Sequence, residues 1–459
     1  MKKILLMLAL GCSIAHAQCT RFQSADSSAY DSQLKTVSLP WRTDLPSSIG
    51  SKQFAWEGKQ FEKDWRGYMQ AFLSEIKIAG VEISGRRLHM NPSAEWWISP
   101  WMDYGTSGRE KLNGLTAERG PKDGDLSPNS KAGAQTWAVG WYNRPGSFAI
   151  SQIFSDPCNP SIPTGWSFPN QSASFKFLFS DADVSQVTYL EGAPEIDAFI
   201  NPANVQVGPV KNRESRSMRL IQVDIAVRDP AAKETGWVMG TFVWRKPAAG
   251  FKGDWLYDNL VPVGLMWGND PGIQNDQWDA FSAVKQSQLN MDLAGTLWQA
   301  SGQTWKERPY PGFQGRLNGP ADNPRSSCLS CHAAAQWRRD QPIVGSPNLD
   351  ATLTSDLIRS HVLKYFGNTP AGSRHAGSSV GTSLDYSLQL EAGIDRLCRA
   401  CNDEKLIGPT PELCKVPIVR PTDPKVSYVD RSTCNRNPVS SFFMKLLLPS
   451  PSLEPLPRQ

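Results

Sequence analysis

Two cysteines and a histidine lie together in the pentapeptide Cys328-Leu329-Ser330-Cys331-His332. This Cys-x-x-Cys-His spacing is the pattern by which a c-type haem is covalently attached. Two thiols on one turn can reach the two vinyl groups of a porphyrin, and the next residue places an imidazole under its iron. Cys328 and Cys331 are therefore the candidate attachment residues, and His332 is the candidate proximal ligand of the iron. The sequence predicts one covalently bound haem c.

The same cysteine pair has three other interpretations. It could form a disulfide, act as a thioredoxin-like redox pair, or supply half of a zinc site. The N-terminus favours the haem interpretation over these. Residues 1–17 combine Lys2-Lys3, a short apolar run and Ala15-His16-Ala17, which is the pattern of a secretory signal peptide. Because covalent haem attachment takes place outside the bacterial inner membrane, the signal and the motif support each other.

These features predict a chain exported to the periplasm and cleaved after Ala17. Lipoprotein anchoring at Cys12 is the less favoured alternative, since the apolar stretch before Cys12 is very short. No later segment approaches the roughly 18 apolar residues that a spanning helix needs, so no membrane span is expected after removal of the signal. A net charge of +4 is too small to indicate a nucleic-acid partner.

Six further cysteines remain once the signal and the haem motif are set aside: Cys19, Cys158, Cys398, Cys401, Cys414 and Cys434. An even number of cysteines suits disulfides in an oxidising compartment. A zinc site is the alternative for the four cysteines between residues 398 and 434. Cys401 is followed by Asn402 rather than by a histidine, so this second Cys-x-x-Cys is not a second haem motif.

Residue patterns predict an α+β chain with two large parts. Residues 18–270 form an aromatic-rich, mainly antiparallel and sandwich-like β region, residues 271–400 a helical region, and residues 401–459 a Cys-containing extension with an irregular tail. Alternating apolar residues predict strands at 147–154, 175–179, 184–190, 221–227, 237–244 and 261–265. Apolar residues three and four positions apart predict helices at 57–78, 278–298, 331–337, 353–366 and 383–397. The tryptophans between residues 91 and 146 are expected to fill a core rather than to line a ligand groove.

The order of the C-terminal elements resembles that of a class I cytochrome c domain. A haem-binding helix, a middle helix, a long loop and a closing amphipathic helix follow one another over roughly residues 275–400. The stretches 135–143, 236–242 and 263–270 also resemble large exported bacterial proteins of the cytochrome c family. These resemblances imply a class I-like helical haem domain behind a large N-terminal region, and they name no substrate.

The sequence departs from that family at the sixth iron ligand. Class I domains usually carry a methionine in the loop before the closing helix, whereas the loop 367–382 contains none and offers His375 instead. His375 is therefore the leading distal candidate. His361, Met444, and an upstream residue or an open position remain as alternatives, and His361 fits a packed core position better than ligation.

Two classes of function follow. The first is an exported monohaem electron carrier that works with a periplasmic redox partner protein. The second is a haem enzyme of peroxidase or oxygenase type, or a haem-based sensor, with an open distal position. The missing loop methionine favours the second class, whereas the single haem and the lack of a recognisable substrate module favour the first. A docking face or haem-propionate partners could come from the arginines around the motif, which are Arg325, Arg338, Arg339, Arg359, Arg374, Arg396 and Arg399.

Overall fold

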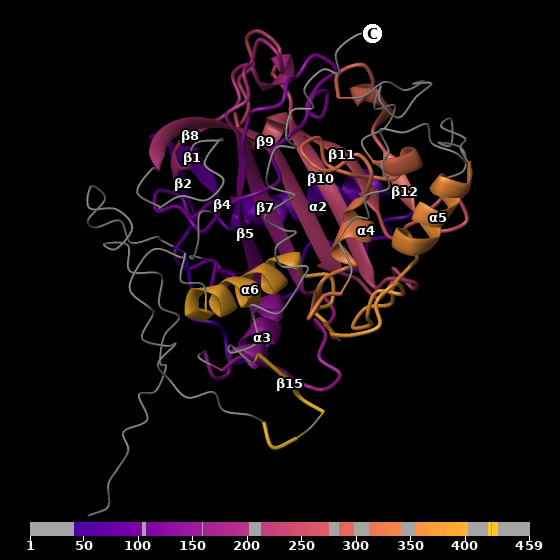
Figure 1. Ribbon diagram of the computed structural model, residues 1–459. Coiled ribbons are helices and arrows are strands. Elements are labelled where there is room, and N and C mark those ends of the chain that lie inside the picture. The colour runs from indigo at the N-terminus through magenta and orange to yellow at the C-terminus, as the bar shows by residue number, and fades with distance from the viewer. Residues whose placement is uncertain are drawn as a thin grey trace, which may run out of the picture.

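A computed structural model gives the fold of most of the chain (Figure 1). It describes residues 41–102, 107–157, 159–201, 213–274, 284–297, 312–340, 343, 355–402, 421–423 and 425–429. This part of the protein is a mixed α+β structure built on an antiparallel sheet of nine strands. The predicted α+β class with a mainly antiparallel sheet is therefore confirmed.

The large sheet has a main path of seven strands, in the order β12-β11-β10-β9-β7-β5-β3, while β4 pairs with β5 and β8 pairs with β9. The strands are β3 (Trp96–Ile98), β4 (Thr116–Ala117), β5 (Thr136–Asn143), β7 (Ala173–Ser180), β8 (Glu195–Ile200), β9 (Glu214–Arg228), β10 (Trp237–Trp244), β11 (Leu260–Met266) and β12 (Ser287–Leu289). The strands expected at 175–179, 221–227, 237–244 and 261–265 correspond to β7, β9, β10 and β11. In these four segments the period-two alternation predicted the strands correctly.

In the described part of the chain, three small two-stranded sheets accompany the large one. They pair β1 (Glu82–Ser84) with β2 (Arg87–His89), β13 (Gln336–Trp337) with β14 (Thr382–Ser383), and β15 (Ser427–Tyr428) with β6 (Ser161–Ile162). The helices are α2 (Trp65–Ile78), α3 (Arg144–Ile153), α4 (Cys328–His332), α5 (Ser355–Tyr365) and α6 (Leu388–Asn402). Short 3-10 turns lie at Thr188–Leu190, Tyr257–Asn259, Met291–Leu293 and Phe313–Gly315.

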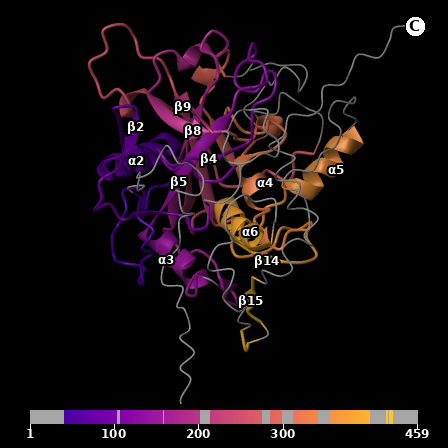
Figure 2. The same cartoon turned by 60° about the vertical axis from the view of Figure 1, so that its left-hand side comes forward.

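Helices cover both faces of the large sheet (Figures 1 and 2). On one face, Phe72 and Ile76 of α2 share an apolar core with Phe175, Phe177 and Val223 of the strands. The opposite face is covered by α3, α4 and α6, whose apolar residues form a second core with the sheet. Among the described residues the large sheet therefore packs against helices and loops rather than against a second large sheet, unlike the expected sandwich.

The C-terminal helices do not form a distinct helical cytochrome domain in the described part of the chain. Leu329 of α4 and Ile394 of α6 lie in one continuous core with Met239 and Val263 of the sheet. The strand β12 also lies beyond residue 270 and pairs with β11. The prediction of a separate class I-like helical domain is therefore wrong for the described residues. These helices bury their apolar faces against the sheet instead of against one another.

Local capping explains two further differences from the sequence predictions. The helix α2 begins at Trp65 rather than near residue 57, because the Asp64 side chain accepts a hydrogen bond from Gly67 N and caps the helix there. The strand expected at 147–154 is the helix α3 instead. Asn143 caps it by accepting from Gly146 N at 3.1 Å, and Pro145 lies in its first turn, where proline is favoured.

Three other predicted elements also differ. The segment 184–190 forms turns and a 3-10 helix instead of a strand. Residues 287–289, within the helix expected at 278–298, form β12 because they pair with the edge of β11. The haem helix occupies 328–332 rather than 331–337, and its successor is the strand β13. The helices expected at 353–366 and 383–397 correspond to α5 and α6.

The aromatic stretch between residues 91 and 146 fills the core, as expected. Its tryptophans are at most 3% exposed: Trp96, Trp97, Trp101, Trp137 and Trp141. The predicted signal peptide with Cys12, most of the 401–459 extension and Met444 lie outside the described residues. Within the described residues, no helix has the length and apolar character needed to cross a membrane.

Candidate functional site

The Cys-x-x-Cys-His pentapeptide forms the short helix α4, which is fixed at its start. Ser327 is the N-cap, and its Oγ accepts a hydrogen bond from Ser330 N at 3.0 Å. Ser330 Oγ accepts in turn from Ser327 N at 2.8 Å, which completes a capping box. Ser327 Oγ also donates to Asn269 Oδ1 at 2.7 Å, and Leu329 is buried against the sheet. The turn that carries all three candidate residues is therefore held from two sides.

His332 is held in a defined tautomer. Its Nδ1 lies 2.8 Å from the backbone oxygen of Tyr386. Because a carbonyl oxygen can only accept a hydrogen bond, Nδ1 must carry the proton. Burial lowers the pKa of His332 to about 4, so the ring is neutral at pH 7 and Nε2 keeps a free lone pair. A neutral imidazole with Nδ1–H bound to a carbonyl is the form in which histidine binds a metal through Nε2.

Cys328 and Cys331 are free thiols that remain partly exposed. Cys328 Sγ lies 3.7 Å from Asn318 Oδ1, to which it can donate a hydrogen bond. Burial raises the pKa of Cys331 to about 12 and also raises that of Cys328. A thioredoxin-like pair instead needs a thiol of lowered pKa. In the described part of the chain, no group of three or more His, Cys, Asp or Glu residues is arranged to hold a metal ion.

A polar row crosses the sheet beside these cysteines. Lys176 of β7 is paired in register with Asp224 of β9, and Asp224 is paired with Thr241 of β10. Lys176 Nζ lies 3.3 Å from Asp224 Oδ2, and Thr241 Oγ1 donates to Asp224 Oδ1 at 2.9 Å. The charges of Asp224 and Asp322 help to raise the pKa of Cys328, whereas Lys176 lowers it, so the row lies within electrostatic range of the thiol.

Gln222 of β9 connects this row to the loop that precedes α4. Its Nε2 donates to both carboxylate oxygens of Asp224, at 2.9 and 3.0 Å, and to Asp322 Oδ2 at 3.3 Å. Its Oε1 accepts from Ala321 N at 3.0 Å. The side chains of Lys176 and Asp224 keep 29% and 22% of their surface exposed. Burial nevertheless raises the pKa of Asp224 to about 6, against the opposing effect of Lys176.

Sequence analysis did not single out this row. Lys176 and Asp224 lie within the strands predicted at 175–179 and 221–227, and a charged residue flanked by buried aromatic or branched residues on each strand is the signal that could have found them. Their neighbours Phe175, Phe177, Val223 and Ile225 face the core on the α2 side. Because successive side chains of a strand point to opposite faces, Lys176 and Asp224 face the side that α4 and α6 cover. The side chain of Gln389 in α6, for example, lies over Gly140 of β5, in the same cross-sheet row as Lys176.

His375, the leading distal candidate, is buried in the loop before α6. Its Nδ1 accepts a hydrogen bond from Gly377 N at 3.2 Å, and its ring also hydrogen-bonds to the backbone of Tyr365. The rings of Tyr365 and His375 stack with centroids 6.4 Å apart. An iron bond would have to replace one of these interactions, and ligation by His375 stays a prediction.

His361 packs in a small aromatic core. Its ring centroid lies 5.1 Å from that of Phe313 and 5.5 Å from that of Phe366. Its Nε2 lies 3.1 Å from Arg325 O and must donate to it. Nδ1 is therefore unprotonated in the neutral ring, and it is buried without a partner among the described atoms. This placement fits the expected core role of His361, while its lone pair keeps ligation open as a prediction.

Cys398 is disulfide-bonded, which agrees with the disulfides expected for an exported chain. The structure does not describe the side chain of its partner. The structure does not describe the side chains of the other non-haem cysteines, which are Cys19, Cys158, Cys401, Cys414 and Cys434. Their pairing therefore stays a prediction.

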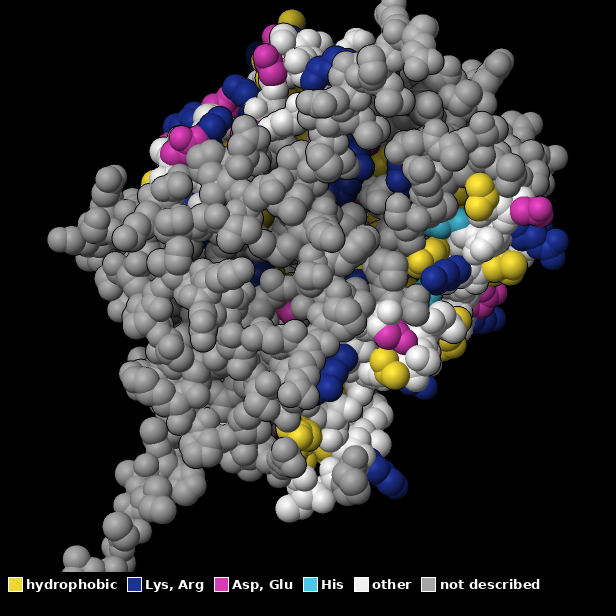
Figure 3. Space-filling model, viewed as in Figure 1, with side chains coloured by type: hydrophobic (Ala, Val, Ile, Leu, Met, Phe, Trp, Pro, Cys, Tyr) yellow, Lys and Arg dark blue, Asp and Glu magenta, His cyan; other side chains and the backbone are white. Residues whose placement is uncertain are grey.

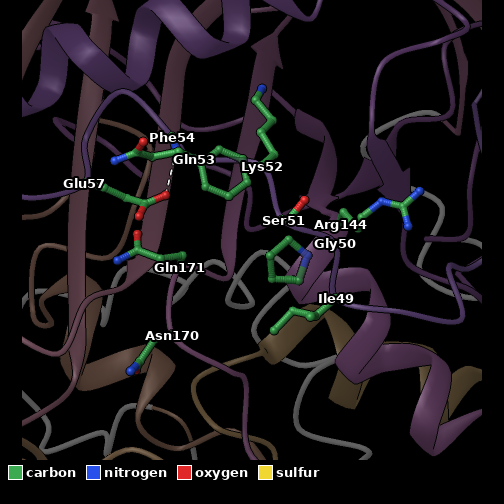
Figure 4. A pocket seen from close by; sticks show the side chains of 11 residues that line it. Ile49, Gly50, Ser51, Lys52, Gln53, Phe54, Glu57, Arg144, Asn170 and Gln171 are labelled. Atoms are coloured by element: carbon green, nitrogen blue, oxygen red, sulfur yellow. Dashed lines mark hydrogen bonds between the residues drawn. The ribbon is translucent and has the colours of Figure 1, made fainter.

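A separate surface pocket of about 340 Å³ lies at the start of α3 (Figure 4). Phe54 and Glu57 lie on one side of it and Arg144 on another. Its cations are already paired, since Lys52 Nζ lies 2.6 Å from Glu75 Oε2 and Arg144 Nε lies 2.7 Å from Glu95 Oε1. No residue of α4 lines it, so it is not part of the candidate haem site.

Comparison with known proteins gives no match: no family model, no curated protein and no solved structure matches this chain. The assignment of a function therefore rests on the chemistry of the residues around α4.

Proposed function

We propose that the protein is an exported monohaem c-type cytochrome that transfers electrons in the periplasm. The observation that carries this proposal is the state of the three motif residues. Two thiols that are not bridged to each other lie on one helical turn with a neutral imidazole whose Nδ1–H is bound to Tyr386 O. This donor set fits two thioether bonds and one axial nitrogen, and it fits a disulfide, a reactive thiol pair or a zinc site less well.

In this proposal Cys328 and Cys331 would carry the thioether links, and His332 Nε2 would bind the iron. When bound, the haem would supply an iron centre that accepts and releases one electron. The chain itself fixes the ligand. Ser327 and Asn269 hold the start of α4, and the carbonyl of Tyr386 orients the imidazole and increases its basicity.

The surface around α5 has features suited to binding a protein redox partner. Two apolar side chains of α5 are exposed to solvent, Leu357 at 41% and Leu363 at 59%. Arg359 and Lys364 are exposed on the same helix. Charged and apolar side chains lie together over this part of the molecule (Figure 3). Such a mixed patch suits a transient complex, in which charges steer the encounter and a small apolar area makes the contact.

A haem enzyme or sensor is the second candidate, and the polar row favours it. Asp224, with a pKa of about 6, and Lys176 are ionisable, accessible and within electrostatic range of Cys328. A carboxyl group of this kind can donate and accept protons where a ligand is transformed. Despite its burial, the charges of Glu118, Asp224 and Asp322 raise the pKa of Lys176, so Lys176 stays protonated and supplies a fixed positive charge. An electron carrier does not need such groups. The haem enzyme or sensor, in contrast, requires an open sixth position on the iron at which a ligand can bind.

Visible absorption spectra of the oxidised and reduced protein separate the two candidates. The electron-carrier proposal predicts a low-spin spectrum in both states, with little change when cyanide or carbon monoxide is added, because the sixth position is filled. A high-spin ferric spectrum with ready binding of these ligands would instead support the enzyme or sensor. The absence of any haem spectrum from protein made with a haem-attachment system would contradict both.

A further inference from the structure

The carbonyl that holds His332 belongs to a turn with an unusual backbone. Asp385 and Tyr386 have φ angles of 45° and 70°, in the left-handed region that residues other than glycine rarely adopt. Two such residues in succession persist only where the surrounding contacts determine the conformation. The direction of the Tyr386 carbonyl is thus set by whatever holds this turn.

The side chain of Asp385 holds the turn to three distant segments. Its Oδ1 accepts hydrogen bonds from Trp237 Nε1 at 3.0 Å and from Gly372 N at 2.9 Å. Its Oδ2 accepts from Phe168 N at 2.8 Å. The residue is only 1% exposed. Burial raises the pKa of the Asp385 carboxyl, and these three donors act in the opposite direction by favouring the carboxylate.

Tyr386 is fixed at its other end as well. Its hydroxyl donates to Thr369 O at 2.5 Å, and its ring lies against that of Trp237 with centroids 6.0 Å apart. The same indole therefore contacts the Tyr386 ring and donates to Asp385. With its side chain and its backbone both held, the residue presents its carbonyl oxygen to His332 Nδ1 in one direction.

We propose that Asp385 is a positioning residue that fixes the tautomer of His332 through the Tyr386 carbonyl and lowers the reduction potential of a haem bound there. The inference rests on the proposed haem attachment. Two effects act in the same direction. A firm hydrogen bond at Nδ1 makes the imidazole a stronger donor to iron(III), and a buried negative charge one residue from its partner favours the more positive oxidation state.

The test is the reduction potential of the haem-loaded full-length protein with Asp385→Asn. The asparagine keeps one oxygen for Trp237 and Gly372, but it removes the charge and turns an N–H group toward Phe168 N. We expect the equilibrium for reduction to shift about tenfold toward the ferrous form, which is 59 mV for one electron. If the sixth position is open, the iron–imidazole stretching frequency of the five-coordinate ferrous form, read by resonance Raman spectroscopy, should fall in parallel.

Glu110→Gln is the matched control. Glu110 is also fully buried, and its carboxylate accepts from the backbone N–H groups of Leu112, Asn113, Leu115 and Phe199. Leu115 packs in the core on the α2 face of the sheet, away from α4. This variant should cost stability without moving the potential or the iron–imidazole frequency. A potential that moves equally in both variants, or in neither, would overturn the inference.

A second measurement keeps the inference testable if Asp385→Asn does not fold. In reduced low-spin wild-type protein, with carbon monoxide added where the sixth position is open, the Nδ1 proton of His332 should exchange slowly with solvent by NMR. Rapid exchange would contradict a fixed Nδ1–H bond. Wild-type protein whose haem is fully removed by acidified acetone would overturn the proposed attachment itself, which is a result distinct from an unchanged potential in haem-loaded Asp385→Asn.

Discussion

His332 and Tyr386, whose backbone oxygen accepts the hydrogen bond from the imidazole, lie 54 positions apart in the sequence. The Cys-x-x-Cys-His motif alone therefore cannot reveal this contact. The types and spacing of Cys328, Cys331 and His332 predict a haem site, which stays a prediction. The carbonyl of Tyr386 could not be predicted, because any residue carries such an oxygen and only the fold selects one. Asp385 was hidden for a similar reason, since its three hydrogen-bond donors come from segments far apart in the chain.

The distal ligand is tested at the same scale by His375→Ala. Imidazole is a stronger donor to iron(III) than a thioether, so ligation by His375 predicts low-spin haem in the wild type. The variant should open the sixth position, shift the ferric absorption spectrum toward high spin and bind cyanide readily.

His361→Ala is its control, because His361 is also buried but packs among Phe313, Phe366 and Tyr365. It should lower stability and leave the spin state unchanged. A low-spin spectrum that survives His375→Ala and disappears in His361→Ala would transfer the distal role to His361.

At the scale of elements, hydrophobic patterns predicted the faces of strands but not what covers those faces. The strands β7, β9, β10 and β11 were found because alternation reports burial of one side. The helix α3 was missed, since its start depends on the cap at Asn143 and on Pro145 rather than on periodicity. Lys176 and Asp224 point to the side that α4 and α6 cover, and no local pattern distinguishes a covered polar face from a solvated one.

The contact between α6 and the segment after β13 gives a pH-dependent prediction. Arg339 Nε lies 2.8 Å from Glu391 Oε1, and the two side chains are only 4% and 8% exposed. Burial raises the pKa of Glu391 to about 7, despite the opposing effect of Arg339. The folded protein therefore binds this proton more tightly than the unfolded chain, so the associated stability is full below about pH 4.3 and is lost as the pH rises toward 7.

Thermal unfolding of wild type and Glu391→Gln at several pH values measures this effect. Relative to the variant, the wild type should lose on the order of 3–4 kcal/mol between pH 4 and pH 8, at about 1.4 kcal/mol per pKa unit. If the stability of the two proteins changes with pH in parallel, the pKa of Glu391 is the same in the folded and unfolded states, and the prediction is wrong.

Over the whole molecule, the sheet serves as the platform for the candidate haem site. The helices α4 and α6 complete a core that they share with β10 and β11, so the site depends on residues from both of the predicted domains. The resemblance to a class I domain rested on the order of helices, which says nothing about whether they pack on one another or on a sheet. Length and composition could not separate these arrangements either.

A fragment of residues 271–400 tests this architecture. Without the sheet, Leu329, Leu390 and Ile394 would lose their partners Met239 and Val263. Each large apolar side chain left without its core costs roughly 2–5 kcal/mol, which is a large share of the stability of a domain. We expect the fragment to be unfolded by circular dichroism and to hold no haem with a native spectrum. A fragment that folds cooperatively and reproduces the full-length haem spectrum would show an independent cytochrome domain.

Covalent attachment of one haem is the central claim, and intact mass spectrometry tests it most directly. The exported protein is made with a haem-attachment system, extracted with acidified acetone and weighed under denaturing conditions. Wild type should carry the mass of one haem, and Cys328→Ala combined with Cys331→Ala should carry none, because both thioether bonds are then impossible. Wild-type protein with the mass of the bare polypeptide, and with its haem in the acetone phase, would contradict the account.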